Sequence, residues 1–287
     1  MKVIKVGSRE SKLAVIQSET VINMIKDKYP EYKTELITMK TTGDKILDVT
    51  LDKIGGKGLF VKELDYALLK GLSDITVHSL KDMPMEVNSE LPVIAYSKRA
   101  NPFDALVLPI GSDKIDFSKP VGCSSQRRSI QFKKLYPDAE IKPVRGNVQT
   151  RLKKLDSGEY SALILAAAGL ERLGLSDRIF RIFSVDEMIP AAGQGIIAVQ
   201  CKKGGGYEFL KEISDRSSEI CAIAEGACIK RLNGGCSAPA AAFCQIIDNR
   251  LYLRGMNEIN GEIVTAQLWA DIEDAEKAGQ LLAERLM

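Results

Sequence analysis

Short apolar runs alternate with longer amphipathic segments along most of the chain, and this alternation limits the possible folds more than any other feature. Strands are expected at 2–7, 34–40, 74–78, 93–97 and 105–109, with helices at 11–28 and 59–70. After Pro120 the pattern repeats, with strands at 120–123, 139–144 and 163–165 and helices at 125–135, 147–156 and 167–173. This pattern predicts α/β domains with mostly parallel sheets.

The C-terminal part has a different pattern. After Gly204-Gly205-Gly206 we expect a helix at 217–232, strands at 238–247, 250–256 and 262–269, and a final helix from Asp271. A chain of 287 residues is longer than one core usually holds. We therefore expect two α/β domains and a small α+β domain. Their expected limits are 1–98 with a return segment at 194–212, then 99–193, then 213–287.

Composition excludes several classes of protein. The net charge is +2, which is too small for a nucleic-acid binder that works by overall charge. The apolar run at the amino terminus is too short for a signal peptide or a membrane span, so we expect a cytoplasmic protein that binds neither nucleic acid nor membrane. The six cysteines form no Cys-x-x-Cys pair and His78 is the single histidine, so no metal site is expected.

Polar and basic residues follow several expected strands of the second domain. Gly122-Cys123-Ser124-Ser125-Gln126-Arg127-Arg128 runs from a strand into a helix, where free N–H groups, hydroxyls and guanidinium groups can bind an anion. Similar groups recur at Arg145-Gly146-Asn147 with Arg151, at Arg172, and in the first domain at Arg9 and Ser11. Each alone could be a capped helix with solvated arginines. Together they predict one crevice that holds a polyanionic ligand.

Three further segments carry reactive groups whose roles the residues alone leave open. Lys81 and Asp82 follow a buried strand and precede Pro84, and such a pair is commonly solvated. The Gly-rich segment 53–60 lacks the Gly-Lys-Ser/Thr ending of a phosphate loop, so it is either a mobile basic lid or a surface turn. Cys236 follows two glycines in an expected loop, and its thiol could be a nucleophile, a covalent anchor or simply free.

Four motifs, in this order and spacing, together resemble the porphobilinogen deaminase (hydroxymethylbilane synthase) family: Gly55-Gly56-Lys57-Gly58-Leu59-Phe60, His78-Ser79-Leu80-Lys81-Asp82-Met83-Pro84, Arg145-Gly146-Asn147 and Gly234-Gly235-Cys236. The resemblance covers nearly the whole chain. It implies two periplasmic-binding-protein-like (type II) domains and a third that carries the cofactor. It also implies a cytoplasmic, monomeric transferase of tetrapyrrole (heme and porphyrin) biosynthesis, which condenses four porphobilinogen molecules head to tail into hydroxymethylbilane and releases ammonia.

The resemblance also implies roles for individual residues. Asp82 and Lys81 would be catalytic, and a dipyrromethane cofactor would be joined to Cys236 by a thioether. The other cofactor-binding residues would be Lys81, Asp82, Ser79, Ser124, Ser125, Arg127, Arg128, Arg145 and Asn147. The substrate-binding residues would be Arg9, Ser11, Gln17, Phe60, Arg151, Arg172 and Gln194. The sequence departs from the family pattern at Cys123, where Thr is usual, at Ser237, where Gln is common, and in ending early at Met287.

Two other functions fit the sequence less well. A noncatalytic two-lobed anion-binding protein would have the same cleft, but it has no need of Cys236, and a carboxylate such as Asp82 among arginines would lower its affinity for an anion. A nucleotide-dependent transferase would need a phosphate loop that segment 53–60 does not provide.

Overall fold

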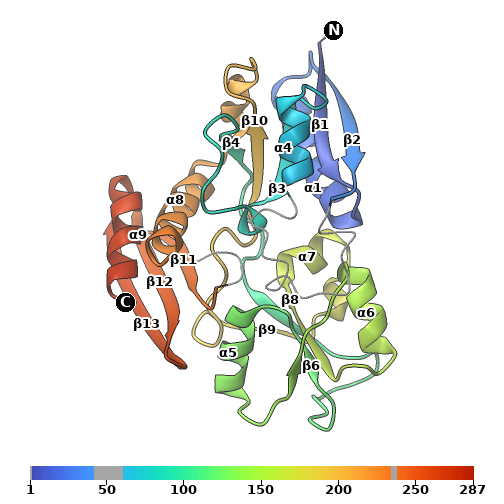
Figure 1. Ribbon diagram of the computed structural model, residues 1–287, viewed down its shortest axis with the longest axis vertical. Helices are drawn as coiled ribbons and strands as arrows, with labels where there is room; N and C mark the ends of the chain where they lie inside the picture. The colour runs from blue at the N-terminus through green and yellow to red at the C-terminus, as the bar shows by residue number, and fades with distance from the viewer. Residues whose placement is uncertain (1, 42–60, 234–237) are drawn as a thin grey trace.

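The computed structural model describes residues 2–41, 61–233 and 238–287 (Figure 1). Three β-sheets organise this part of the chain, two of them five-stranded and one three-stranded. The expected lid at 53–60, with Phe60, and the expected anchor Cys236 lie outside the described residues.

The first sheet has the strand order β2-β1-β3-β10-β4. Its strands are β1 (Val3–Arg9), β2 (Lys33–Met39), β3 (Ile75–Ser79), β4 (Val93–Tyr96) and β10 (Ile197–Cys201). Helices α1 (Lys12–Lys28) and α4 (Lys62–Leu69) belong to the same lobe. Val21 and Ile25 of α1 pack on Ile4, Val6 and Val77 of the sheet. This apolar layer fixes the position of β3, whose carboxyl end carries polar residues.

The second sheet has the order β7-β6-β8-β5-β9. Its strands are β5 (Asp104–Val107), β6 (Val121–Gly122), β7 (Ile141–Lys142), β8 (Ala162–Ala166) and β9 (Arg181–Ile182). Helices α5 (Gln126–Leu135), α6 (Val148–Asp156) and α7 (Ala167–Arg172) accompany it. Gly122 allows β6 to lie close to its neighbours, because a Cβ there would stand 2.5 Å from Leu163 Cδ2.

The expectation of mostly parallel sheets was wrong, since each of the two five-stranded sheets contains as many antiparallel as parallel pairings. The reason is that the chain crosses twice between the lobes. Residues 97–103 leave β4 at its carboxyl end and enter the second sheet at the edge where β8 ends. The next strand, β5, therefore runs opposite to β8. Residues 183–196 return in the same way, and β10 lies antiparallel between β3 and β4.

Both large sheets therefore share one topology. One strand of each sheet arrives from the other lobe, β10 in the first sheet and β5 in the second. When the other four strands are numbered in chain order, the first lies between the second and the third. The arriving strand lies between the third and the fourth. The carboxyl ends of β3 and β8 face the junction between the two lobes (Figure 1).

The third sheet is an antiparallel meander of β11 (Ala241–Ile247), β12 (Arg250–Ile259) and β13 (Glu262–Asp271). Helices α8 (Arg216–Arg231) and α9 (Ala275–Glu284) pack on it and on each other (Figure 1). Gly279 lets α9 approach α8, because a Cβ there would collide with the carbonyl oxygen of Ala224. Five cysteines lie in the described part of the chain, and all are buried free thiols.

Candidate active site

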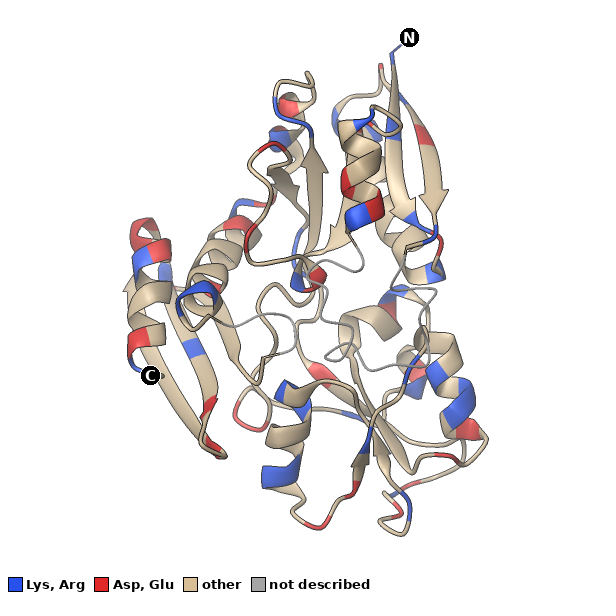
Figure 2. Cartoon of the chain, in the orientation of Figure 1, with Lys and Arg blue, Asp and Glu red and all other residues tan. Residues whose placement is uncertain are grey.

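A cavity of about 350 Å³ lies where the two lobes meet. Among its described lining residues, Asp82 is the one acidic side chain, and the basic side chains are Lys81, Arg127, Arg128, Arg151 and Arg172. Over the rest of the described chain, acidic and basic residues are mixed (Figure 2), in keeping with the small net charge. The excess of positive charge is therefore local to the cavity, which suits an anionic ligand.

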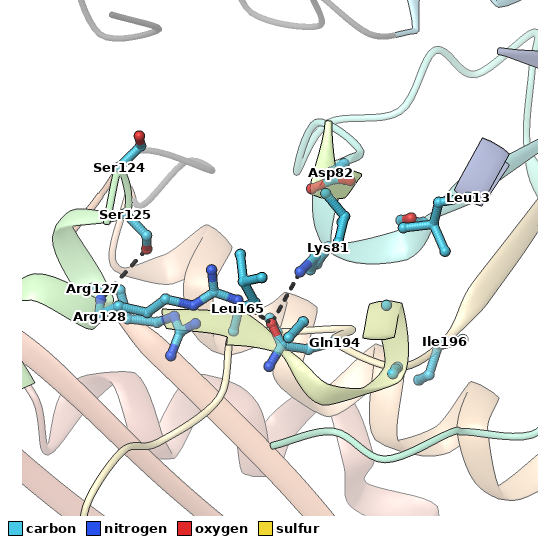
Figure 3. A pocket seen from close by; sticks show the side chains of 18 of the residues that line it. Leu13, Lys81, Asp82, Ser124, Ser125, Arg127, Arg128, Leu165, Gln194 and Ile196 are labelled. Carbon is cyan, nitrogen blue, oxygen red and sulfur yellow. Dashed lines mark hydrogen bonds between the residues drawn. The ribbon is translucent and has the colours of Figure 1, made fainter. Parts of the chain in front are cut away.

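Lys81 and Asp82 come from the first lobe. They lie on one turn of 3-10 helix, Leu80–Asp82, that directly follows β3. Lys81 Nζ donates to Gln194 Oε1 over 3.1 Å, while Asp82 is exposed (Figure 3). Burial lowers the pKa of Lys81 to about 8, and Arg128 adds to this effect. Lys81 is thus a cation that can lose its proton near neutral pH.

Ser124 and Ser125 lie across the cavity from this turn, where β6 leads into α5 (Figure 3). Ser125 caps α5 by accepting from the Arg128 N–H over 3.5 Å. Ser124 Oγ donates to the Val144 carbonyl over 2.7 Å. The amino-terminal end of α5, which favours negative charge, therefore faces the cavity with both hydroxyls beside it.

Asp104, the first residue of β5, was not predicted as a site residue. Its buried carboxylate accepts from Arg127 Nη1 over 2.8 Å and from Arg128 Nε over 2.9 Å. Burial by itself raises the pKa of Asp104, but Arg127 and Arg128 outweigh burial and hold that pKa well below its usual range. An acid opening the apolar strand Asp104-Ala105-Leu106-Val107 was the available signal, because such a residue needs a buried partner.

The two remaining arginines of the cavity donate to backbone carbonyls. Arg151 Nε donates to Gly146 over 2.8 Å, and Arg172 Nη2 donates to Gly195 over 2.7 Å. Burial lowers the pKa of Arg151 to about 10, with Arg128 adding to the effect. Burial likewise lowers the pKa of Arg172. Both guanidinium groups keep further N–H donors in their forks, so each can also bind an oxyanion.

The structure brings many of the predicted residues together. Those that line the cavity are Gln17, Ser79, Lys81, Asp82, Ser124, Ser125, Arg127, Arg128, Arg151, Arg172 and Gln194. Gln17 Nε2 donates to Ser79 Oγ over 2.8 Å, which joins α1 to the end of β3.

Four predicted residues do not line this cavity: Arg9, Ser11, Arg145 and Asn147. Ser11 and Asn147 instead cap α1 and α6. Cys123 is buried and donates its thiol to the Ser125 carbonyl, so it is not a cavity donor. The described residues contain no cluster of His, Cys, Asp and Glu that could hold a metal ion. Nor do they include a helix long and apolar enough to cross a membrane.

The fold and this cavity define a class of protein in which two α/β lobes of the same topology enclose a basic pocket. Two family descriptions match the chain: "Porphobilinogen deaminase, dipyromethane cofactor binding domain" over residues 4–207, and "Porphobilinogen deaminase, C-terminal domain" over residues 219–287. The chain belongs to the porphobilinogen deaminase family.

Relatives named porphobilinogen deaminase match this chain over most or nearly all of its length. A porphobilinogen deaminase of Acetivibrio thermocellus is 55% identical over 285 residues, which cover 99% of this chain and 98% of the relative. One of Ruminiclostridium cellulolyticum is 58% identical, covering 91% and 90% of the two chains. One of Neisseria meningitidis serogroup A is 44% identical, covering 99% and 94%. Among solved structures, the aliphatic sulphonate binding protein SsuA of Escherichia coli has a TM-score of 0.43 at 10% identity, covering 81% and 71%.

Proposed function

We propose that the chain is a transferase that condenses four porphobilinogen molecules head to tail into hydroxymethylbilane and releases ammonia at each step of the condensation. This is a reaction of tetrapyrrole biosynthesis. The observation that carries the proposal is the family match over residues 4–207 and 219–287. The basic cavity, whose one carboxylate among the described lining residues is Asp82, supports it, because every pyrrole unit brings two carboxylates. We further propose a cytoplasmic monomer that binds neither nucleic acid nor membrane.

The residues of the cavity fit a dipyrromethane cofactor, because cations, hydroxyls and a helix amino terminus suit a group that carries several carboxylates. We propose that Cys236 anchors this group through a thioether. The residues proposed to hold it are Ser79, Lys81, Asp82, Ser124, Ser125, Arg127, Arg128, Arg145 and Asn147. When bound, the cofactor supplies the pyrrole ring to which the first substrate unit is joined.

Asp82 and Lys81 are the proposed catalytic residues. The Asp82 carboxylate, exposed at the cavity, is placed to accept from pyrrole N–H groups and to stabilise the positive charge that develops as ammonia departs. The Lys81 ammonium beside it can hold a carboxylate of the ligand in place. The proposed substrate-binding residues are Arg9, Ser11, Gln17, Phe60, Arg151, Arg172 and Gln194.

The first test is Asp82→Asn, assayed for porphobilinogen consumption and ammonia release. Removing one preorganised electrostatic group costs roughly 100- to 1000-fold in kcat, and we expect at least this loss. Because Asp82 is exposed and does not contribute to a core, thermal unfolding should stay as in the wild type. Intact mass should show that the variant keeps the added mass of the cofactor. A turnover within threefold of the wild type would refute the catalytic role.

The second test is Cys236→Ser. We expect this variant to purify without the added mass of the cofactor, to give no colour with an acidic aldehyde reagent for pyrroles, and to be inactive. The matched control is Cys201→Ser, since Cys201 is buried in the first lobe away from the cavity. It should lose stability but keep the added mass. An adduct retained by Cys236→Ser would show that the anchor lies elsewhere.

The same measurements separate the noncatalytic alternative. A two-lobed anion-binding protein would bind porphobilinogen without consuming it and would carry no added mass. Steady consumption with release of ammonia by the wild-type chain excludes that alternative.

A further inference from the structure

Asp104 lies at the centre of a hydrogen-bonded row beside the cavity. Its Oδ1 accepts from Gln194 Nε2 and from Arg128 Nε, both over 2.9 Å, and its Oδ2 accepts from Arg127 Nη1 over 2.8 Å. Gln194 Oε1 in turn accepts from Lys81 Nζ over 3.1 Å. The row runs from α5 through β5 and the second crossing segment to the turn after β3. It therefore connects the two lobes.

We propose that Asp104 is a positioning residue for the reaction: it orients Arg128 directly, and Lys81 through the Gln194 amide, toward the carboxylates of the ligand. This inference rests on the proposed function, because it concerns the same cavity.

The orientation of the Gln194 amide carries the argument. Its Nε2 faces Asp104 Oδ1 and, over 2.6 Å, the carbonyl oxygen of Pro102. The Pro102 carbonyl and the ionised Asp104 carboxylate are acceptors and have no hydrogen to donate, so the amide nitrogen must point at them. Its oxygen is consequently turned toward Lys81 Nζ and, over 3.5 Å, Arg128 Nη2. Asp104 and the Pro102 carbonyl thus together hold the amide oxygen toward Lys81.

Arg127 has a supporting position in the same row. Its Nη1 donates to Asp104 and, over 2.7 Å, to the Ile189 carbonyl, and its side chain is 5% exposed. These contacts direct Arg127 into the second lobe and hold the Asp104 carboxylate at Oδ2, the oxygen that does not contact Gln194. Arg128 is fixed in a similar way, because its Nε donates to Asp104 Oδ1 and its Nη1 donates to the Ile164 carbonyl over 3.2 Å.

Asp104 also acts on Lys81 by charge. The ionised groups that face Lys81 are Asp82 on its own turn, Arg127 and Arg128 on α5, and Asp104 on β5. The two carboxylates raise the pKa of Lys81 and the two arginines lower it. Neutralising Asp104 therefore lowers the pKa of Lys81 further, and Lys81 loses its proton at a lower pH.

The test compares Asp104→Asn with the wild-type holoenzyme. An asparagine keeps one oxygen but loses the charge that pairs with Arg127 and Arg128, which weakens the hold on Arg128 and on the Gln194 amide. We expect KM for porphobilinogen to rise at least tenfold, with a smaller change in kcat. The alkaline limb of kcat/KM should move to lower pH, and Asp104→Glu, which restores the charge, should move the limb back.

A second readout does not depend on turnover. Lysine residues are dimethylated with 13C-formaldehyde, the Lys81 signal is assigned with Lys81→Arg, and its pKa is measured by NMR in both proteins. We expect a lower Lys81 pKa in Asp104→Asn. An unchanged Lys81 pKa together with a KM within twofold of wild type would overturn the inference. A wild-type chain without turnover would sink the proposed function alone, since the Lys81 titration would still decide the role of Asp104.

The matched control is Asp156→Asn. Asp156 also accepts two hydrogen bonds from an arginine of the second lobe, Arg178, over 2.7 and 3.2 Å, but neither residue lines the cavity. The KM and the pH profile of Asp156→Asn should match those of the wild type. If Asp104→Asn does not fold, Gln194→Met decides, because it removes the amide contacts with Asp104 and Lys81 without a charge change. An unaltered KM and Lys81 pKa in that variant would overturn the inference.

Discussion

Individual residues in the cavity have pKa values that their surroundings change, and Lys81 is the one that titrates nearest to neutral pH. Burial and the nearby arginines favour its neutral form, so its pKa falls from the usual value of 10.5 to about 8. A polyanionic ligand favours the charged form instead. Binding should therefore be linked to protonation of Lys81.

This linkage predicts a pH dependence. Below pH 8 Lys81 is mostly charged and can pair with a ligand carboxylate, and above pH 8 it loses the proton and the pairing. We expect kcat/KM to fall above about pH 8, and kcat to fall only at a higher pH, because bound ligand raises the Lys81 pKa. Lys81→Arg, which stays charged, should lack the limb near pH 8. If Lys81→Arg still showed the fall in kcat/KM near pH 8, that fall would belong to another group.

At the scale of elements, the catalytic turn after β3 depends on a close contact with the second crossing segment. Gly193 has φ +71°, and a Cβ at this position would stand 2.6 Å from Leu80 Cγ. Leu80 immediately precedes Lys81 and Asp82. The glycine therefore allows the crossing segment and the turn to pack together in the one register that also places Gln194 against Lys81.

Gly193→Ala should consequently impair catalysis as well as stability. Gly204→Ala is its matched control, because Gly204 has φ +69° and no atom within 4 Å of the added Cβ. Both variants should lose roughly 1–2 kcal/mol of unfolding free energy from the left-handed backbone. Only Gly193→Ala should also lower kcat/KM, by about tenfold or more. Equal kinetics in the two variants would show that the Leu80 contact does not position the turn.

For the whole molecule, Glu225 of α8 joins the third domain to both crossing segments. Its carboxylate accepts from Arg99 Nη1 over 2.6 Å in the first crossing, and from the backbone N–H of Gly193 over 2.7 Å in the second. It also accepts from the backbone N–H of Cys244 over 2.7 Å in β11. One fully buried carboxylate thus ties together three parts of the chain that are far apart in the sequence.

Glu225→Gln should destabilise the assembly of the domains, because it leaves the largely covered Arg99 side chain, 13% exposed, without its charge partner. We expect a loss of about 3 kcal/mol of unfolding free energy and earlier unfolding of the third domain in urea. Glu219→Gln on the same helix is the control. Its pair with Arg216 is exposed and should contribute less than about 0.5 kcal/mol. A loss in Glu225→Gln no larger than that of the control would contradict this role.

The sequence by itself determined the class of fold, the family and most of the polar residues that line the cavity. Hydrophobic periodicity located the helices and strands, because burial of one face is a local property of the chain. Residues such as Arg128, Arg151 and Lys81 could be grouped because they follow strand ends, and strand ends meet at one edge of a sheet. The family motifs then supplied the proposed chemistry.

The tertiary structure alone decided how the strands run and how the charges pair. The antiparallel β5 and β10 result from two crossings between lobes, and no local pattern states the direction in which a strand enters a sheet. Asp104 meets Arg127, Arg128 and Gln194 across separations of 23, 24 and 90 residues. Such pairings depend on where folded elements meet in space, and the free energy that selects them is the cost of leaving a buried charge without partners.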